Sequence, residues 1–130
     1  MTLNLGKMTR PKLPSDVIIR EPETEISRET VTVLAGSGAE RALEVGTVLG
    51  QITASSKVVA LNPAGADGSQ TAYGVLVTNT TAPDGADSDG VAITSLAALR
   101  SAGLIWPAGI TANQKAAALA ALKAKLIVAR

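Results

Sequence analysis

The chain has 130 residues, of which 46% are hydrophobic, and this is enough for one small domain with a buried core. It contains no cysteine and no histidine, which excludes disulfides, thiolate metal sites and the commonest nucleophiles and general bases. A net charge of +1 with one Trp and one Tyr favours neither nucleic-acid binding nor a base-stacking surface.

The core must be almost entirely aliphatic, because the sequence has no Phe and aliphatic side chains bury less area than aromatic ones. A small aliphatic domain has modest stability alone, so we expect association with itself or with a partner. No secretory hydrophobic segment follows Lys7 and Arg10, and the longest helical apolar run, residues 116–122, is too short to span a bilayer. We therefore expect synthesis in the cytoplasm and no membrane partner.

The first 27 residues carry mixed charge, brief apolar runs and prolines at positions 11, 14 and 22, a pattern typical of an extended arm. Val17, Ile18 and Ile19 are its exception, because three β-branched residues favour a strand. Such a strand either adds to an exposed sheet edge of another chain or packs on its own domain. We favour the first interpretation, in which removing residues 1–27 leaves the body, residues 28–130, and its oligomer intact.

Between residues 28 and 99, short apolar or alternating runs separated by glycine-rich turns predict a mainly β domain. Residues 28–34 alternate Thr with Val, which indicates a strand with one solvent-facing side. Further strands are expected at residues 43–45, 47–53, 57–61, 73–78 and from 91 towards 99. Residues 62–69 and 80–90 carry turn-forming residues and are predicted to be loops.

One helix is predicted near the carboxyl end, at about residues 112–126. Thr111 and Gln114 have the spacing of a capping box, in which each side chain bonds to the backbone N–H of the other residue. The alanine-rich segment that follows contains neither Gly nor Pro, so its helix propensity is high. The sequence therefore predicts a helix that begins at Ala112.

The faces of this helix differ in their side chains. Leu119, Leu122 and Leu126 lie at i, i+3 and i+7 and form one stripe, which should point inward. The opposite face carries only alanines, and it is either exposed to solvent or a subunit contact. Residues 126–129 are expected to form a terminal strand or a buried tail.

Trp106 and Pro107 precede the helix and lie between Gly103 and Gly109. This pattern indicates a rigid turn that carries one large apolar side chain. Core packing is favoured over ligand binding for Trp106, since large apolar side chains serve mostly to fill cores.

Residues 84–90, Asp-Gly-Ala-Asp-Ser-Asp-Gly, have the alternating carboxylates of a calcium loop, but the register fails. If Gly90 takes the sharp-turn position, the first and last ligand positions fall on Gly85 and Leu96, which carry no carboxylate. The glycine-rich segments at 36–38 and 65–68 have no phosphate-loop spacing. We therefore expect no catalytic residue, metal, cofactor or small-molecule substrate.

Three motifs together resemble a known family by their order and spacing. They are Gly-Thr-Val-Leu-Gly-Gln-Ile-Thr at residues 46–53 followed by Ser56 and Lys57, Tyr-Gly-Val-Leu at residues 73–76 after an Asp-Gly loop, and Leu-Ile-Trp-Pro at residues 104–107. From about residue 31 to residue 130 the sequence resembles the lambda-type head decoration proteins of tailed bacteriophages. The Trp-Pro pair is the most specific element, and the longer amino-terminal region departs from the lambda type.

The resemblance implies a β-clip-like domain that forms homotrimers and binds the major capsid protein of the same phage. These trimers would occupy threefold sites on the outer surface of the expanded head and stabilise it against internal DNA pressure, with the arm pairing with strands of the shell. The expected capsid-binding residues are Val17, Ile18 and Ile19, and the expected fold or trimer-interface anchors are Trp106, Pro107, Leu119 and Leu122. The alternative is a β-rich interaction module of another virion part, such as a tail or adhesin component.

Overall fold

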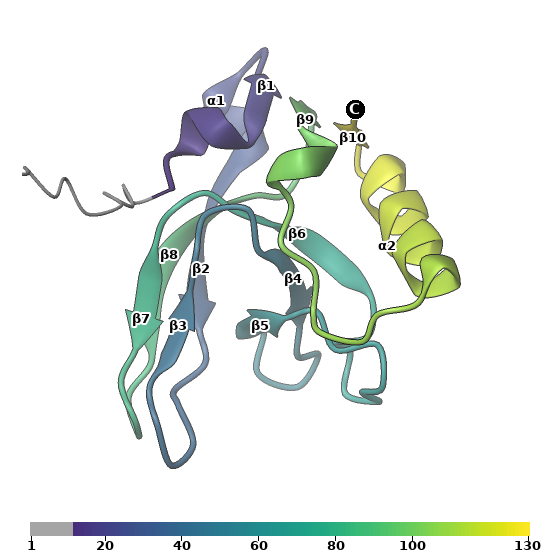
Figure 1. The fold of residues 1–130 in the computed structure, drawn as a ribbon. Coiled ribbons are helices and arrows are strands. Elements are labelled where there is room, and N and C mark those ends of the chain that lie inside the picture. The colour runs from purple at the N-terminus through teal and green to yellow at the C-terminus, as the bar shows by residue number, and fades with distance from the viewer. Residues whose placement is uncertain (1–11) are drawn as a thin grey trace, which may run out of the picture.

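The centre of the molecule is a closed five-stranded barrel (Figure 1). The computed structural model describes residues 12–130. Around the barrel the strands follow the order β2 (Arg28–Val33), β5 (Val58–Ala60), β4 (Val48–Gln51), β6 (Ala72–Leu76) and β8 (Ser88–Ile93). Most neighbours are antiparallel, and β2 pairs with β8 over six residues. The expected mainly β fold is confirmed, and each of these strands overlaps a predicted strand.

The barrel wall separates two apolar cores, because successive side chains of a strand point to opposite faces. The first core contains Leu49 of β4 together with Val33 and Leu76. The second core contains the neighbour of Leu49, Val48, and lies on the other side of the barrel wall. In β6, Val75 likewise lies in the second core. The near-continuous apolar runs of β4 and β6 therefore arise from burial on both faces.

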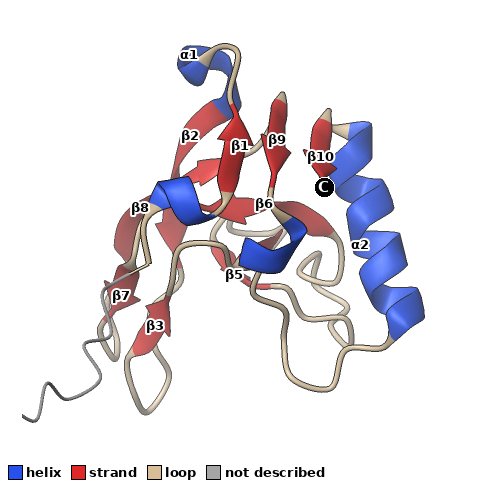
Figure 2. Cartoon of the chain, turned by 45° about the horizontal axis from the view of Figure 1, so that its top comes forward, coloured by secondary structure: helices blue, strands red, loops and turns tan. Residues whose placement is uncertain are grey.

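A three-stranded sheet and a helix cover the second core from outside the barrel (Figure 2). The sheet has the order β1 (Ile18–Arg20), β9 (Ala97–Leu99) and β10 (Ile127–Ala129), with β1 antiparallel and β10 parallel to β9. The expected terminal strand at the carboxyl end is thus confirmed as β10. Three short elements complete this end: η1 (Pro14–Asp16), α1 (Thr24–Ser27) and η2 (Ser101–Gly103).

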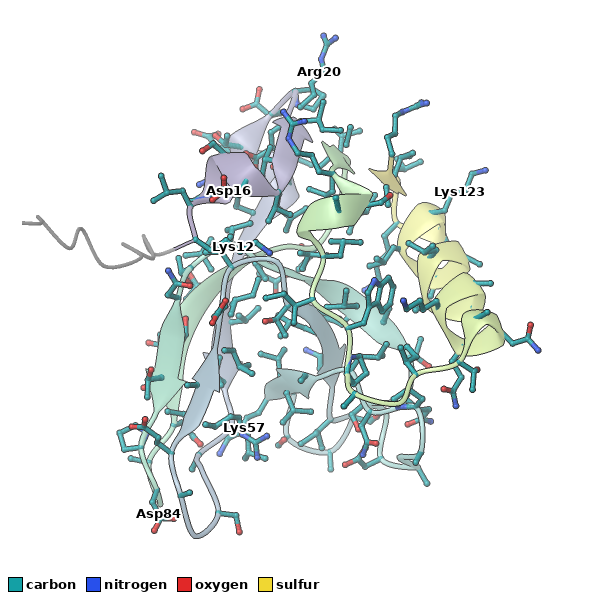
Figure 3. The ribbon with its side chains drawn as sticks, in the orientation of Figure 1. Lys12, Asp16, Arg20, Lys57, Asp84 and Lys123 are labelled. Atoms are coloured by element: carbon teal, nitrogen blue, oxygen red, sulfur yellow. The ribbon has the colours of Figure 1, made fainter. Side chains whose placement is uncertain are left out.

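A two-stranded ribbon extends from the opposite end of the barrel, where β3 (Arg41–Leu43) pairs with β7 (Thr80–Ala82). The prediction of a loop over residues 80–90 is therefore wrong, since β7 and the first residues of β8 lie within it. The Asp and Gly residues of this stretch favour turns locally, but cross-strand pairing with β2 and β3 outweighs that preference. Only the tip, near Asp84, turns (Figure 3).

Helix α2 (Ala112–Ala124) begins as predicted. The Thr111 Oγ1 accepts a hydrogen bond from the Gln114 backbone N–H at 3.1 Å, and the Gln114 Oε1 accepts one from the Thr111 N–H at 2.9 Å. The helix ends two residues before the predicted end, because Leu126 adopts a left-handed conformation with φ of 63°. The capping box is confirmed and the carboxyl end is corrected.

The inward face of α2 differs from the predicted leucine stripe. Leu122 is buried and Leu119 is half-buried, but Leu126 lies beyond the helix and is 63% exposed. Ala118 takes its place in the second core. The stripe prediction is therefore wrong at Leu126, since a left-handed residue leaves the helical periodicity on which the prediction depends.

Lys125 fastens the carboxyl end of the helix to the barrel. Its Nζ lies 4.1 Å from the centroid of the Tyr73 ring and donates a 3.0 Å hydrogen bond to the Tyr73 carbonyl oxygen. The Tyr73 hydroxyl donates to Glu29 of β2 at 2.9 Å. Partial burial lowers the pKa of Lys125 and raises that of Tyr73, because each charged form loses hydration.

Replacing Thr111 with Ala is expected to destabilise the protein by about 1 kcal/mol, within the range of about 0.5–2 kcal/mol that helix caps contribute. The substitution leaves the Gln114 N–H without its acceptor. Urea unfolding at fixed protein concentration measures the effect. Thr111→Ser keeps the oxygen and serves as the control, and equal losses in both variants would show that the hydroxyl contributes nothing.

Candidate functional site

Val17, Ile18 and Ile19 lie where the chain joins the three-stranded sheet, and their surroundings differ. Val17 is fully buried in the second core, and its carbonyl oxygen accepts a hydrogen bond from the Arg100 N–H at 2.6 Å. Ile18 is half-buried and pairs with Leu99, whereas Ile19 is 45% exposed. The expected arm of residues 1–27 is thus joined to the folded body before residue 28, since Val17 is buried in the second core and Lys12 is hydrogen-bonded to Asn79 and Gly103. Residues 1–11 of that arm lie outside the described structure.

The outer edge of β1 is open among the strands of residues 12–130, because β1 is the terminal strand of its sheet. The order β1, β9, β10 leaves one backbone edge of β1 without a partner strand from the described part of the chain. Ile19 and Arg20 are exposed beside this edge, and Arg20 projects outward from the molecule (Figure 3). An open edge with exposed side chains is the geometry that adds a strand of another chain.

Glu21 fixes the turn that follows β1. The Arg28 guanidinium donates to both Glu21 carboxylate oxygens, with Nε–Oε2 and Nη2–Oε1 distances of 2.8 Å, and the Ser27 hydroxyl donates to the same carboxylate. The Glu21 side chain is only 7% exposed. The hydrogen bonds from Arg28, followed by the bond from Ser27, hold the pKa of Glu21 below its ordinary value. This clip therefore holds the end of β1 and the start of β2 together.

The Glu21 clip predicts a stability that depends on pH. Because the folded-state pKa of Glu21 is lowered, the clip stabilises the fold above the ordinary carboxyl value of 4.5. That contribution is lost as the pH falls through the folded-state value. The difference between the unfolding midpoints of the wild type and Glu21→Gln should therefore be full at pH 6 and should shrink as the pH falls from 4.5 towards 3. Glu25→Gln, at an exposed position of α1, is the control, and a difference that persists unchanged at pH 3 would contradict the prediction.

Trp106 is half-buried and packs against the second core. Its outer side borders a cleft of about 300 Å³ that reaches β3 and β4 and is lined by Leu43, Glu44, Val48, Ile105, Trp106 and Pro107, among others. The Lys115 Nζ lies 5.8 Å from the Trp106 ring centroid and covers the ring from the first turn of α2. Trp106 therefore joins the barrel to the helix, and Pro107 shares the wall of the cleft.

Leu119 and Leu122 of the helix face the second core together with Ala118, whereas most of the other alanines face outward. Leu122 is 1% exposed and Leu119 is half-buried. The outer face is exposed at Ala116, Ala117, Ala120 and Ala124, whereas Ala121 is half-buried. The role of this face as a subunit contact stays a prediction.

The three acidic residues of the 84–90 stretch have separate partners, and Asp89 accepts a hydrogen bond from the Thr32 hydroxyl of β2 at 3.4 Å. Asp87 accepts a hydrogen bond from the Ala35 N–H at 2.8 Å and pairs with the Lys57 Nζ at 2.7 Å, and Asp84 accepts from the Gly38 N–H at 2.9 Å. The hydrogen bond from Lys57 is the main cause that lowers the pKa of Asp87. Within residues 12–130, no group of three or more acidic side chains gathers in a way that suits a metal ion.

A comparison with models of protein families places the chain. The family model of bacteriophage lambda head decoration protein D matches residues 7–127. The chain belongs to this family. No match is found among curated protein sequences.

Membership in the head decoration family makes the chain a structural component of a phage capsid. The family match begins at residue 7, whereas the resemblance based on motifs began at about residue 31. It therefore includes β1 and Lys12 as well as the barrel. None of the helices in the described part of this decoration protein has the length and hydropathy to cross a membrane.

One contact of this decoration protein, between Lys12 and Asn79, was not predicted from the sequence. Lys12 and Asn79 lie 67 positions apart, and the Asn79 Nδ2 donates to the Lys12 carbonyl oxygen at 3.0 Å. Neither belongs to a motif or to a periodic pattern. No local signal could have paired them, because the barrel alone brings the two segments together.

Proposed function

We propose that this decoration protein binds as homotrimers at threefold sites on the outer surface of the expanded phage head and acts without catalysis. Its partner is the major capsid protein of the same phage, and it stabilises the shell against internal DNA pressure. The observation that carries the proposal is the family match, which extends over nearly the whole chain. The small aliphatic core, with no aromatic side chain buried among its largest members, supports a protein that gains stability by association.

The proposed mechanism is thermodynamic. A protein that binds the expanded lattice and not its precursor shifts the equilibrium toward the expanded lattice and stabilises it in proportion to occupancy. Three copies in one trimer add avidity, because attachment of one arm raises the effective concentration of the other two. Each contact with the shell is therefore weak by itself, and the assembly is tight.

The proposed contact with the shell is the amino-terminal segment. Two features support this assignment: the chain leads from residues 1–11 into Lys12 and β1, and the outer edge of β1 is open among the strands of residues 12–130. Because Val17 is buried, the side chains of the original trio that are offered to a partner are Ile19 and, in part, Ile18. We therefore propose that residues 1–11 together with the exposed edge of β1 form the shell-binding surface.

Mixing the protein with expanded, undecorated heads of its own phage tests the proposal. Saturable binding with threefold-symmetric occupancy in electron micrographs is the expected result. Unexpanded heads are the matched control and should remain bare. Failure to coat expanded heads would exclude the decoration role and favour the alternative of a module in another part of the virion.

The oligomeric state is tested separately by light scattering. We expect a mass three times the 13.1 kDa of one chain at micromolar concentration. A mass near that of one chain would contradict the homotrimer.

A further inference from the structure

Lys12 is held by hydrogen bonds at both its backbone and its side chain. The Asn79 Nδ2 donates to the Lys12 carbonyl oxygen at 3.0 Å, and the Lys12 Nζ donates to the Gly103 carbonyl oxygen. Asn79 is itself held, since its Oδ1 accepts from the Val45 N–H at 3.0 Å. Lys12 is half-buried, and in Figure 3 it lies beside the barrel.

Two glycines without a Cβ, Gly46 and Gly103, leave room for the Lys12 side chain and the chain that follows it. A Cβ on Gly46, whose φ is +98°, would lie 2.2 Å from the Gly103 carbonyl oxygen and 2.9 Å from the Lys12 Nζ. A Cβ on Gly103 would lie 2.6 Å from the Asp16 carbonyl oxygen. Gly46 begins the Gly-Thr-Val-Leu-Gly motif and Gly103 precedes Leu-Ile-Trp-Pro. Both motifs therefore contribute a glycine to the same place in the fold.

Hydrogen bonds also hold the chain between Lys12 and the core. The Leu13 N–H donates to the Asp16 carboxylate at 2.8 Å, and the Asp16 N–H donates back to the Leu13 carbonyl oxygen at 2.9 Å. Val17 follows, fully buried. Residues 12–17 are thus fixed to the barrel, and the direction of the chain at Lys12 is set by the folded body.

We propose that Lys12, Asn79, Gly46 and Gly103 form an arm seat that sets the point and direction from which residues 1–11 reach the shell protein. This proposal rests on the proposed function, in which residues 1–11 contact the shell. Lys12 and Asn79 act in it as positioning residues. Eleven residues span at most about 40 Å when fully extended, so the shell contact lies within that radius of Lys12.

The arm seat increases affinity by preorganisation. We call Lys12 the root of the arm. An arm whose root is held at a fixed point of the subunit loses less conformational freedom on binding than an arm whose root is free. The three roots of a trimer are then held at fixed separations, which raises the effective concentration of the second and third arms at their sites. Freeing the root lowers affinity for the head without changing what the arm contacts.

Two nearly isosteric substitutions test the arm seat. Lys12→Met keeps the apolar stem and removes the donor to Gly103, and Asn79→Asp keeps the acceptor for the Val45 N–H and removes the donor to Lys12. Each variant is expected to bind expanded heads at least about 10-fold more weakly than the wild type, which corresponds to about 1.4 kcal/mol. The double variant should lose less than the product of the two effects, because both act on one root. Lys123→Met, at an exposed lysine of α2, is the matched control and should bind like the wild type.

The mass in solution and the urea midpoint of each variant distinguish positioning from folding. Both should stay at the wild-type values while the affinity for heads falls. Affinities of both variants within twofold of the wild type would overturn the proposal. Loss of the oligomer, or a lowered midpoint that accounts for the weaker binding, would also overturn it, because the residues would then act through folding.

A chain that starts at Lys12 separates failure of the arm seat from failure of the proposed function. If this shortened chain still coats heads, residues 1–11 are not the shell contact and the proposed function is wrong in that respect. If the shortened chain fails to bind while Lys12→Met and Asn79→Asp bind normally, only the arm seat is wrong.

Discussion

Removal of residues 1–11 is expected to abolish attachment to expanded heads while the fold and the oligomer remain. The described barrel, cores and helix consist of residues that follow position 11, so we expect the shortened chain to retain them. The arm, in contrast, supplies the proposed contact with the shell, and three arms would act together in the proposed trimer. The loss in avidity should therefore be at least about 100-fold, within the range that multivalent binding supplies.

Sedimentation of heads mixed with the shortened chain measures this loss, and circular dichroism and light scattering check its fold and mass. Removal of residues 1–27 is the informative comparison. That deletion takes away Val17, which is fully buried, and the strand that pairs with β9. We expect it to destabilise the body, in contrast to the interpretation from the sequence that the whole of 1–27 is dispensable. A stable, oligomeric 28–130 fragment would show that the packing of Val17 and β1 contributes little.

Leu122→Ala is expected to destabilise the protein by about 2–5 kcal/mol, the range for removing a buried leucine side chain. Leu122 is 1% exposed and packs in the second core, which it shares with Val75 and Ile127. Truncation leaves a cavity between the helix, the barrel and the three-stranded sheet. Because total stabilities of small domains are about 5–15 kcal/mol, this single change removes a large share.

Leu126→Ala is the matched control for Leu122→Ala. The same atoms are removed four residues later, but Leu126 is 63% exposed, so we expect a change within about 0.5 kcal/mol. Urea unfolding at one fixed protein concentration compares the two, because the stability of an oligomer depends on concentration. Equal losses at both positions would show that Leu126 is covered by a neighbouring subunit.

The parts of the fold that the sequence predicted well depend on contacts between near neighbours. The capping box joins Thr111 to Gln114, three residues apart, and both hydrogen bonds are present. The strands with Thr and Val alternation and the loop at 62–69 likewise follow from the intrinsic preferences of adjacent residues. The family resemblance rested on short motifs of this kind, and the family match confirmed it.

The errors occurred where distant segments override local preference. Thr80–Ala82 carries turn-forming neighbours, yet it becomes β7 because β3 lies beside it. Leu126 continues the spacing of the leucine stripe, yet a left-handed turn directs the chain into β10, which pairs with β9. In each case, several backbone hydrogen bonds to a remote strand outweigh the preference of one short segment.

The sequence by itself determined the mainly β composition, the start of the one long helix, the aliphatic character of the core and the family. The tertiary structure alone decided where the arm ends and the body begins. Val17 joins the core because Arg100 and Gly103 are close to it, and Lys12 is anchored by Asn79 and Gly103. Asn79 and Gly103 lie 67 and 91 positions along the chain from Lys12. A local pattern carries no information about contacts at such separations, because closing the barrel is what creates them.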